Sequence, residues 1–406
     1  MRSGILFAAL LWTILVTLAR GIREPNDFAA AHWLIDYRFG FIRRGLAGTL
    51  VSLFCGITGL EASYGLIVAV GALCLVAVMA CFVWALSILL RRADWDLGTS
   101  IFCVIMASSP MIVLTGHLLS YLDAVFILLL VAALAALHGN QYLLAAGIQI
   151  VAVLVHESYL LVGWPAVVAA CYIWRKPPGR AGVTVAAPAL APLMVMALEP
   201  WSPDAKTALQ HALTVRLTQA GYIIPFKAQL VPRYLLISFR EVWSIESPHF
   251  FSRILDFHRL ILFGPVLAAM AVQARRLHRE WWTVLLAVTP LVLHAVAWDT
   301  TRIWGYTLIT GFAVVVILAF ARPASARPLT LPHGWMVAGV FAIALAMNVK
   351  GHLPLMDSEV DRFDLVVRGI LYLPAAILVG IATWPSRGEE SGSRVPATRA
   401  PDLVPE

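Results

Sequence analysis

Long apolar runs separated by short polar stretches recur along almost the whole chain. A backbone in the hydrocarbon core of a bilayer must satisfy its own hydrogen bonds, so a run of about 20 apolar residues predicts a membrane-spanning helix. The runs lie at about 4–20, 64–90, 99–116, 118–137, 141–156, 158–174, 181–198, 260–274, 281–298, 303–321, 335–349 and 367–384. We therefore expect an all-α fold, a polytopic membrane helical bundle of about twelve transmembrane helices over residues 1–385. The stretch 386–406 is rich in Pro, Ser, Gly and charge, and it predicts a disordered cytoplasmic tail.

The composition supports a membrane protein. Hydrophobic residues make up 60% of the chain and charged residues 13%, against about 45–50% and about 25% in soluble globular proteins. This argues against a cytosolic enzyme, a secreted domain, a disordered protein and a nucleic-acid binder. The net charge of +7 needs no nucleic acid, because membrane proteins collect Lys and Arg in their cytoplasmic loops. The five cysteines lie in apolar stretches without Cys-x-x-Cys spacing, which favours free thiols over a disulfide or metal set.

Four basic clusters set the expected orientation: Arg91-Arg92, 175–180, 275–279 and 322–327. With both termini cytoplasmic, all four fall inside, as the positive-inside rule asks. We therefore expect a multi-pass protein of the inner (cytoplasmic) membrane. This orientation depends on residues 46–60, a short apolar segment with glycines, which we interpret as an interfacial or re-entrant helix on the outer side. The first span also fits a cleaved signal peptide.

The orientation places three loops on the outer face, at about 21–63, 199–259 and 350–366. Basic residues are disfavoured on that side of the membrane. Arg43 and Arg44, next to the predicted interfacial helix, therefore suggest an anionic partner such as a lipid head group or a lipid-linked phosphate. Arginines that snorkel at a helix end are the alternative interpretation.

Three tight turns on the outer side each carry an acid. They hold Asp123, the pair His156-Glu157, and Asp299 with Arg302. Ionisable groups at such positions are rare and usually face a cavity. Taken singly, each acid fits a helix cap or a local ion pair, such as Asp299 with Arg302. Because the three turns share one depth in the membrane, we expect their acids to surround one pocket that opens outward.

The sequence has no Gly-rich phosphate loop, no Gly-x-Ser-x-Gly elbow and no His-Glu-x-x-His zinc motif. We expect neither a metal nor another cofactor. Carboxylates, arginines and aromatic residues at an outward-facing cleft suit sugar transfer from a polyprenyl-phosphate-linked donor held in the bilayer. A carboxylate takes the proton of the acceptor hydroxyl as it attacks the anomeric carbon. Fixed guanidinium groups stabilise the charge that builds on the departing phosphate.

The layout of a first span, an outer loop with Asp36-Tyr37 and then an amphipathic helix resembles the C-type membrane glycosyltransferases, which have the GT-C fold. The run 155–158 and the interrupted polytopic pattern are also similar to membrane polysaccharide polymerases. The resemblance implies a membrane glycosyltransferase or polysaccharide polymerase that works on the extracytoplasmic face. Its partners are then a polyprenyl-phosphate-linked sugar donor, a glycan or lipid acceptor and the lipid bilayer. Asp36 becomes the expected general base, with Asp27 as the competing position.

The resemblance also implies substrate-binding roles for residues around the outer pocket. Arg43 and Arg44 contact the lipid phosphate, and Tyr37 offers a flat face to a sugar ring. The sugar site is lined by Asp123, Glu157 and Asp299. His156 either orients Glu157, binds phosphate or is a buried histidine bonded to a backbone carbonyl. Arg302 is either a second phosphate ligand or the partner of Asp299.

A lipid-linked-sugar flippase or secondary transporter is the main alternative, and a scaffold of an envelope complex is a third. Transporters place their binding sites near the membrane midplane, at broken helices in matching halves of the chain. Here the polar groups lie near the outer rim and the two halves do not match. The pattern therefore favours the glycosyltransferase.

Overall fold

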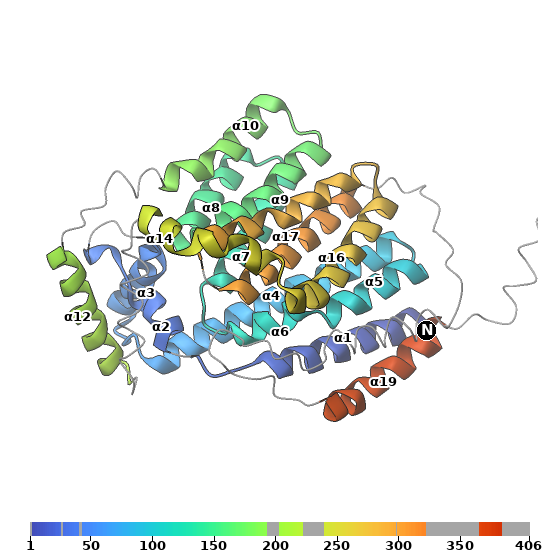
Figure 1. The fold of residues 1–406 in the computed structure, drawn as a ribbon, viewed down its shortest axis with the longest axis horizontal. Helices are drawn as coiled ribbons and strands as arrows, with labels where there is room; N and C mark the ends of the chain where they lie inside the picture. The colour runs from blue at the N-terminus through green and yellow to red at the C-terminus, as the bar shows by residue number, and fades with distance from the viewer. Residues whose placement is uncertain are drawn as a thin grey trace, which may run out of the picture.

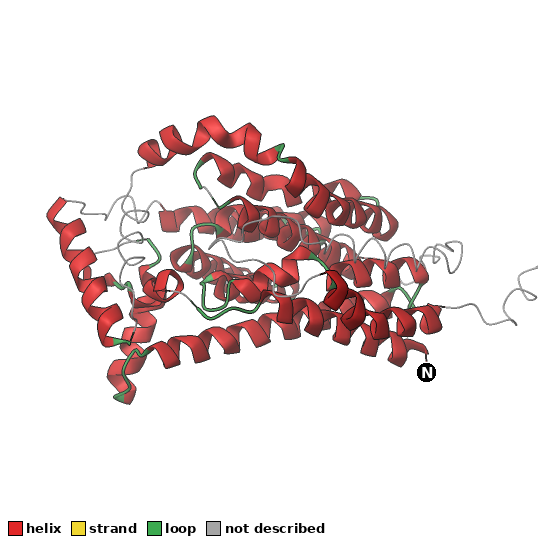
Figure 2. Ribbon diagram, turned by 60° about the horizontal axis from the view of Figure 1, so that its bottom comes forward, coloured by secondary structure: helices red, strands yellow, loops and turns green. Residues whose placement is uncertain are grey.

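The computed structural model describes residues 2–25, 27–39, 43–192, 203–221, 239–297, 299–321 and 365–383. Within these ranges every regular element is a helix, and the ribbon contains no strand (Figure 2). Five helical segments are long and apolar enough to cross a membrane: Arg2–Gly21, Tyr64–Arg92, Leu97–His117 (two consecutive helices), Phe257–Leu277 and Thr300–Ala321. The expected all-α fold is confirmed, and the apolar helices indicate a lipid bilayer as its surroundings.

The helices follow one another with short connections. The first half of the chain forms α1 (Arg2–Gly21), α2 (Asp27–Leu34), η1 (Tyr37–Phe39), α3 (Gly45–Thr58), α4 (Tyr64–Arg92), α5 (Leu97–Ala107), α6 (Pro110–His117), α7 (Asp123–His138), α8 (Tyr142–Val155) and α9 (Tyr159–Ile173). The second half forms α10 (Pro178–Ala186), η2 (Ala187–Ala189), α12 (Pro203–Gln219), α14 (Phe239–Glu246), η4 (Ser247–His249), α15 (Phe250–Ile254), α16 (Phe257–Leu277), η5 (Trp281–Ala295), α17 (Thr300–Ala321) and α19 (Leu365–Thr383).

The long helices lie side by side in one bundle (Figure 1). Helix α17 is buried along most of its length and packs against η5, α9 and α16. Helix α1 packs against α6 and α19. The short helices α2, α3 and α12 gather at one end of the bundle, and the N-terminus lies at the opposite end (Figure 1).

Several predicted spans differ in detail from the structure. The run at 99–116 forms two helices, α5 and α6, because Pro110 has no N–H to continue the hydrogen-bond pattern of α5. The run at 281–298 is the 3-10 helix η5, with Pro290 inside it. Helices α7, α8 and α9 have 16, 14 and 15 residues, which is short of the usual span of about 20. The count of about twelve spans therefore stays a prediction.

Some predicted segments lie outside the described residues. They are the run at 335–349, the last part of the run at 181–198, most of the loop at 350–366, parts of the loop at 199–259 and the tail at 386–406.

Helix α3 has two contrasting faces. On one face, a Cβ added to Gly48 would lie 1.8 Å from the carbonyl oxygen of Ile35, so the glycine allows α3 to approach the chain after α2 closely. The other face exposes Leu50, Leu53, Phe54 and Ile57, which follow helical spacing. The helix thus holds the residues at its start against the bundle while it presents an apolar stripe outward.

Candidate functional site

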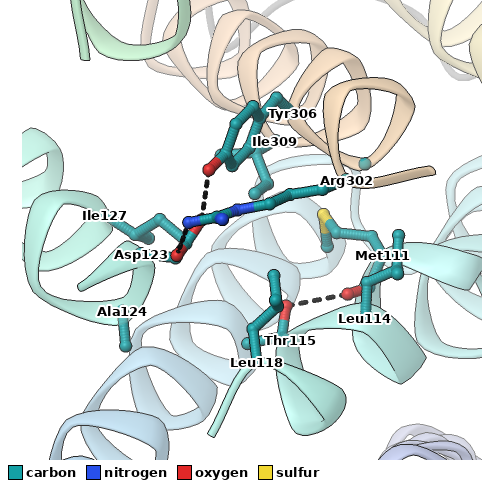
Figure 3. A pocket seen from close by; sticks show the side chains of 11 residues that line it. Met111, Leu114, Thr115, Leu118, Asp123, Ala124, Ile127, Arg302, Tyr306 and Ile309 are labelled. Carbon is teal, nitrogen blue, oxygen red and sulfur yellow. Dashed lines mark hydrogen bonds and ion pairs between the residues drawn. The ribbon is translucent and has the colours of Figure 1, made fainter. Parts of the chain in front are cut away.

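A buried ion pair joins the first residue of α7 to the first turn of α17. The Arg302 Nε donates to Asp123 Oδ1 at 2.9 Å, and Arg302 Nη2 donates to Oδ2 of the same carboxylate. The hydroxyl of Tyr306, one helical turn after Arg302, also donates to Asp123. Figure 3 shows the three side chains meeting at one wall of a narrow hollow that also contacts α6. Because all three residues are buried, the carboxylate and the guanidinium are held in one fixed geometry.

Arg302 has further neighbours on its other sides. Its Nη1 lies 3.8 Å from Asp299 Oδ2, an ion pair longer than a hydrogen bond. Its guanidinium carbon lies 5.1 Å from the ring centre of Tyr121. Its Nη2 lies 3.3 Å from His156 Nε2. His156 Nδ1 accepts the backbone N–H of Ser158 at 3.2 Å, so a neutral ring carries its proton on Nε2. That nitrogen and the guanidinium are then two donors side by side, an arrangement that suits an anionic oxygen.

A second ion pair lies beside the first. Arg44 Nε donates to Glu157 Oε2 at 2.8 Å, and Arg44 Nη2 donates to Oε1. His32 Nδ1 lies 2.7 Å from the carbonyl oxygen of Phe28. A carbonyl only accepts, so this nitrogen carries the proton, and Nε2 accepts from Arg44 Nη1 at 2.8 Å. Arg44 stands at the start of α3 with φ 62, a left-handed conformation that is strained for a residue with a side chain.

The charges of this pair depend on each other. Burial raises the pKa of the Glu157 carboxyl, but Arg44 outweighs burial and holds that pKa well below its ordinary value, and Arg43 lowers it further. Burial, and next the charge of Arg44, lower the pKa of His32 well below its ordinary value. Glu157 is therefore an anion and His32 is neutral at physiological pH. The Glu157 side chain is 36% exposed, so part of this side chain is accessible from outside the bundle.

The connection between α8 and α9 links the two ion pairs. His156 and Glu157 are consecutive residues there, one beside Arg302 and the other paired with Arg44. We call the set formed by Asp123, His156, Glu157, Arg44 and Arg302 the paired-arginine cluster.

Asp36 belongs to a separate cluster at the same end of the bundle. Its Oδ2 accepts from Arg38 Nη2 at 2.6 Å, from Ser52 Oγ at 2.9 Å and from Arg216 Nη1 of α12 at 2.9 Å. The residue is only 1% exposed. The adjoining Ile35 belongs to a buried apolar group that also contains residues next to Asp123 and His156, namely 122 and 155. Within the described ranges, the Asp36 carboxylate bonds to Arg38, Ser52 and Arg216, none of which belongs to the paired-arginine cluster.

The predicted site residues therefore divide into two groups. The acids of the three tight turns come together with Arg44 and Arg302, whereas Asp36 is held by Arg38 and Arg216. Tyr37 lies next to Asp36 in η1 and is partly buried. Asp27 begins α2, and its side chain lies outside the described part of the structure. Among the described residues, the hollow next to Arg302 is lined by one of the predicted acids, Asp123.

Sequence reasoning missed His32 and Tyr306. Tyr306 follows Arg302 by four residues, a spacing that places both on one face of a helix and could have indicated their contact. No comparable local signal identifies His32, because its partner Arg44 comes after an intervening turn.

The opposite end of the bundle carries a different set of charges. Arg276 of α16 pairs with Asp96, just before α5, at 2.6 Å. Arg92 donates to the carbonyl oxygen of Ala319 at 3.0 Å, near the end of α17. Lys176 donates to Asn140 at 2.8 Å. Three of the predicted basic clusters thus lie together at the end away from the paired-arginine cluster.

No protein-family model matches the chain, and no curated protein and no solved structure matches it either. The resemblance to GT-C enzymes therefore stays a prediction. Within the ranges that the structure describes, no group of three or more His, Cys, Asp or Glu side chains could hold a metal ion.

Proposed function

We propose that the protein is a membrane glycosyltransferase or polysaccharide polymerase that transfers a sugar from a polyprenyl-phosphate-linked donor. The observation that carries the proposal is the paired-arginine cluster. Two arginines in the same end of an apolar helical bundle, each held by a carboxylate, suit the recognition of a phosphate at the membrane surface.

The arginines serve the departing phosphate. Asp123 and Tyr306 fix the plane of the Arg302 guanidinium, and His156 Nε2 lies beside it as a further donor. Because these donors are held in place before the reaction, they need not reorient when negative charge develops on the phosphate, and this lowers the barrier to transfer. Arg44 adds a second fixed cation on the other side of the connection between α8 and α9.

Glu157 is the carboxylate best suited to take the proton of the acceptor hydroxyl. It is ionised, because Arg44 keeps its pKa low, and it is the most exposed acid of the cluster. The hydroxyl becomes strongly acidic as its oxygen bonds to the anomeric carbon, so a weakly basic carboxylate suffices. Asp36, the base expected from the sequence, has a side chain that is only 1% exposed and is therefore less accessible to an acceptor.

The proposal includes an orientation. The paired-arginine cluster faces the extracytoplasmic side, and both termini are cytoplasmic, in the inner membrane. The gathering of Arg92, Lys176 and Arg276 at the opposite end supports it, because basic residues accumulate on the cytoplasmic side. The exposed apolar stripe of α3 suits a helix that lies in the outer interface.

The test uses the purified full chain in proteoliposomes. We offer a panel of polyprenyl-phosphate-linked sugars with a glycan acceptor and measure free polyprenyl phosphate and glycosidic product together. The proposal predicts that the two products appear in equal amounts. Movement of the intact donor across the bilayer, with no polyprenyl phosphate released from any donor, would instead identify a flippase.

A further inference from the structure

An apolar groove starts at the paired-arginine cluster and follows the length of the bundle. The hollow next to Arg302 and Asp123 shares four lining residues with a second, larger cavity, so the two adjoin each other. The shared residues are Met111, Thr115, Ile127 and Ile309. The larger cavity runs between α4, α7 and α17 and ends at His138, Trp174 and Phe320.

The groove is long and almost wholly apolar. Between Arg302 and Phe320, α17 advances by about 27 Å at 1.5 Å per residue, close to the hydrocarbon thickness of a bilayer, about 30 Å. The cavity has a volume of about 330 Å³ and is open on one side, which lies at the lower end of the usual range of about 300–1,000 Å³ for pockets that hold small molecules. Among its lining residues, Thr115 donates its hydroxyl to the Met111 carbonyl oxygen at 2.7 Å, so its one hydroxyl proton is already used.

The groove and the cluster together define the chemistry of their occupant. The ligand has one anionic end, where Arg302 and its neighbours lie, and a long apolar remainder without hydrogen-bonding groups. The far end is closed by aromatic rings, since His138 packs edge-to-face against Trp174 and Phe320. The hollow at Arg302 is small, with a volume of about 20 Å³, which favours a single chain over the two acyl chains of a phospholipid.

We infer that this groove holds the single isoprenoid chain of a polyprenyl phosphate, with the phosphate at Arg302 and the chain end near His138. The inference rests on the proposed function, from which it takes the class of ligand. It adds the position of the chain in the groove, and it assigns the selection of chain length to His138, Trp174 and Phe320 at the far end.

Two alanines of α7 offer a matched pair of variants. Ala135 lines the groove, whereas Ala132, one helical turn earlier, does not, and both are exposed. Neither Ala135→Trp nor Ala132→Trp inserts bulk into a packed core, so both proteins should fold. Only the first fills the groove.

The experiment is photolabelling of the full chain in phosphatidylcholine vesicles. The probe is a hexaprenyl phosphate, whose extended chain matches the length of the groove, with a diazirine at its chain end, and the labelled peptides are located by mass spectrometry. We expect label on the far halves of α4, α7 and α17. Ala135→Trp should reduce this label about tenfold, because the indole ring occupies the space of the chain, and Ala132→Trp should leave it unchanged.

Two results would overturn the inference. Label spread evenly over the lipid-facing residues of all helices would show that the chain stays in the bulk lipid. Equal competition by excess phosphatidylglycerol would show an ordinary phospholipid site. The probe carries no sugar, so the labelling does not depend on glycosyl transfer. Labelling of the groove without any glycosyl transfer would support this inference and contradict the proposed function. Glycosyl transfer without labelling of the groove would support the proposed function and contradict this inference.

Discussion

Arg302→Met should lower the free energy of unfolding by about 3–5 kcal/mol, because it leaves the Asp123 carboxylate buried without its cation. The double variant Asp123→Asn with Arg302→Met removes both charges, and it should regain most of the lost stability. Glycosyl transfer should fall by about a hundredfold or more in both variants, because a fixed cation is missing from the departing phosphate. Stability is measured as the shift of the apparent melting temperature in detergent, and transfer is measured well below that temperature.

A second buried ion pair provides the control. Asp96 and Arg276 join α5 to α16 at the opposite end of the bundle, at 2.6 Å and with little exposure. Arg276→Met should destabilise the protein in the same way, and Asp96→Asn with Arg276→Met should restore it. Neither change should alter transfer by the folded protein. If the restored Asp123→Asn, Arg302→Met protein transferred sugar at the wild-type rate, Arg302 would have only a structural role.

Glu157→Gln should lower kcat for transfer by about 10²–10⁴, the range lost with a general base, with little change in stability. The glutamine keeps the shape of the side chain and an oxygen for Arg44, and the position is partly exposed, so the fold should tolerate it. The measurement is the rate of product formation at saturating donor. Glu61→Gln, in the exposed connection between α3 and α4, serves as the control and should have no effect.

Asp36→Asn separates the two possible bases. In the structure, its carboxylate holds Arg38 and Arg216, and through Arg216 it holds α12 against the bundle. We therefore expect Asp36→Asn to loosen α12 and to lower transfer less than Glu157→Gln does. A wild-type kcat in Glu157→Gln together with a large loss in Asp36→Asn would assign the base to Asp36 instead.

The sequence predicts the outline of this arrangement because the turn acids carry a local signal. Asp123 and Glu157 each stand where one apolar run ends and another begins, so alternation of the helices brings them to the same end. The helical class follows from the same apolar runs. The break between α5 and α6 could also be anticipated, since Pro110 is visible in the sequence.

The pairing of charges could not be predicted in the same way. Arg302 has Asp299 within one helical turn, yet its two-bond partner is Asp123, 179 residues away. Asp36 is likewise held by Arg216, 180 residues away. Such partners depend on how helices pack, and hydrophobic periodicity fixes which face of a helix is buried but not which neighbour it meets. The left-handed backbone at Arg44 carries no sequence signal either, since it is not a glycine.

In the proposed function, the paired-arginine cluster recognises a phosphate on a polyprenyl chain. The most direct test compares the binding of undecaprenyl phosphate and of undecaprenol, the same chain without phosphate, to the wild-type protein by native mass spectrometry. We expect the phosphate to bind at least about tenfold more tightly, because each charge-assisted hydrogen bond to it contributes roughly 1.5–3 kcal/mol. Equal binding of the phosphate and the alcohol would contradict it.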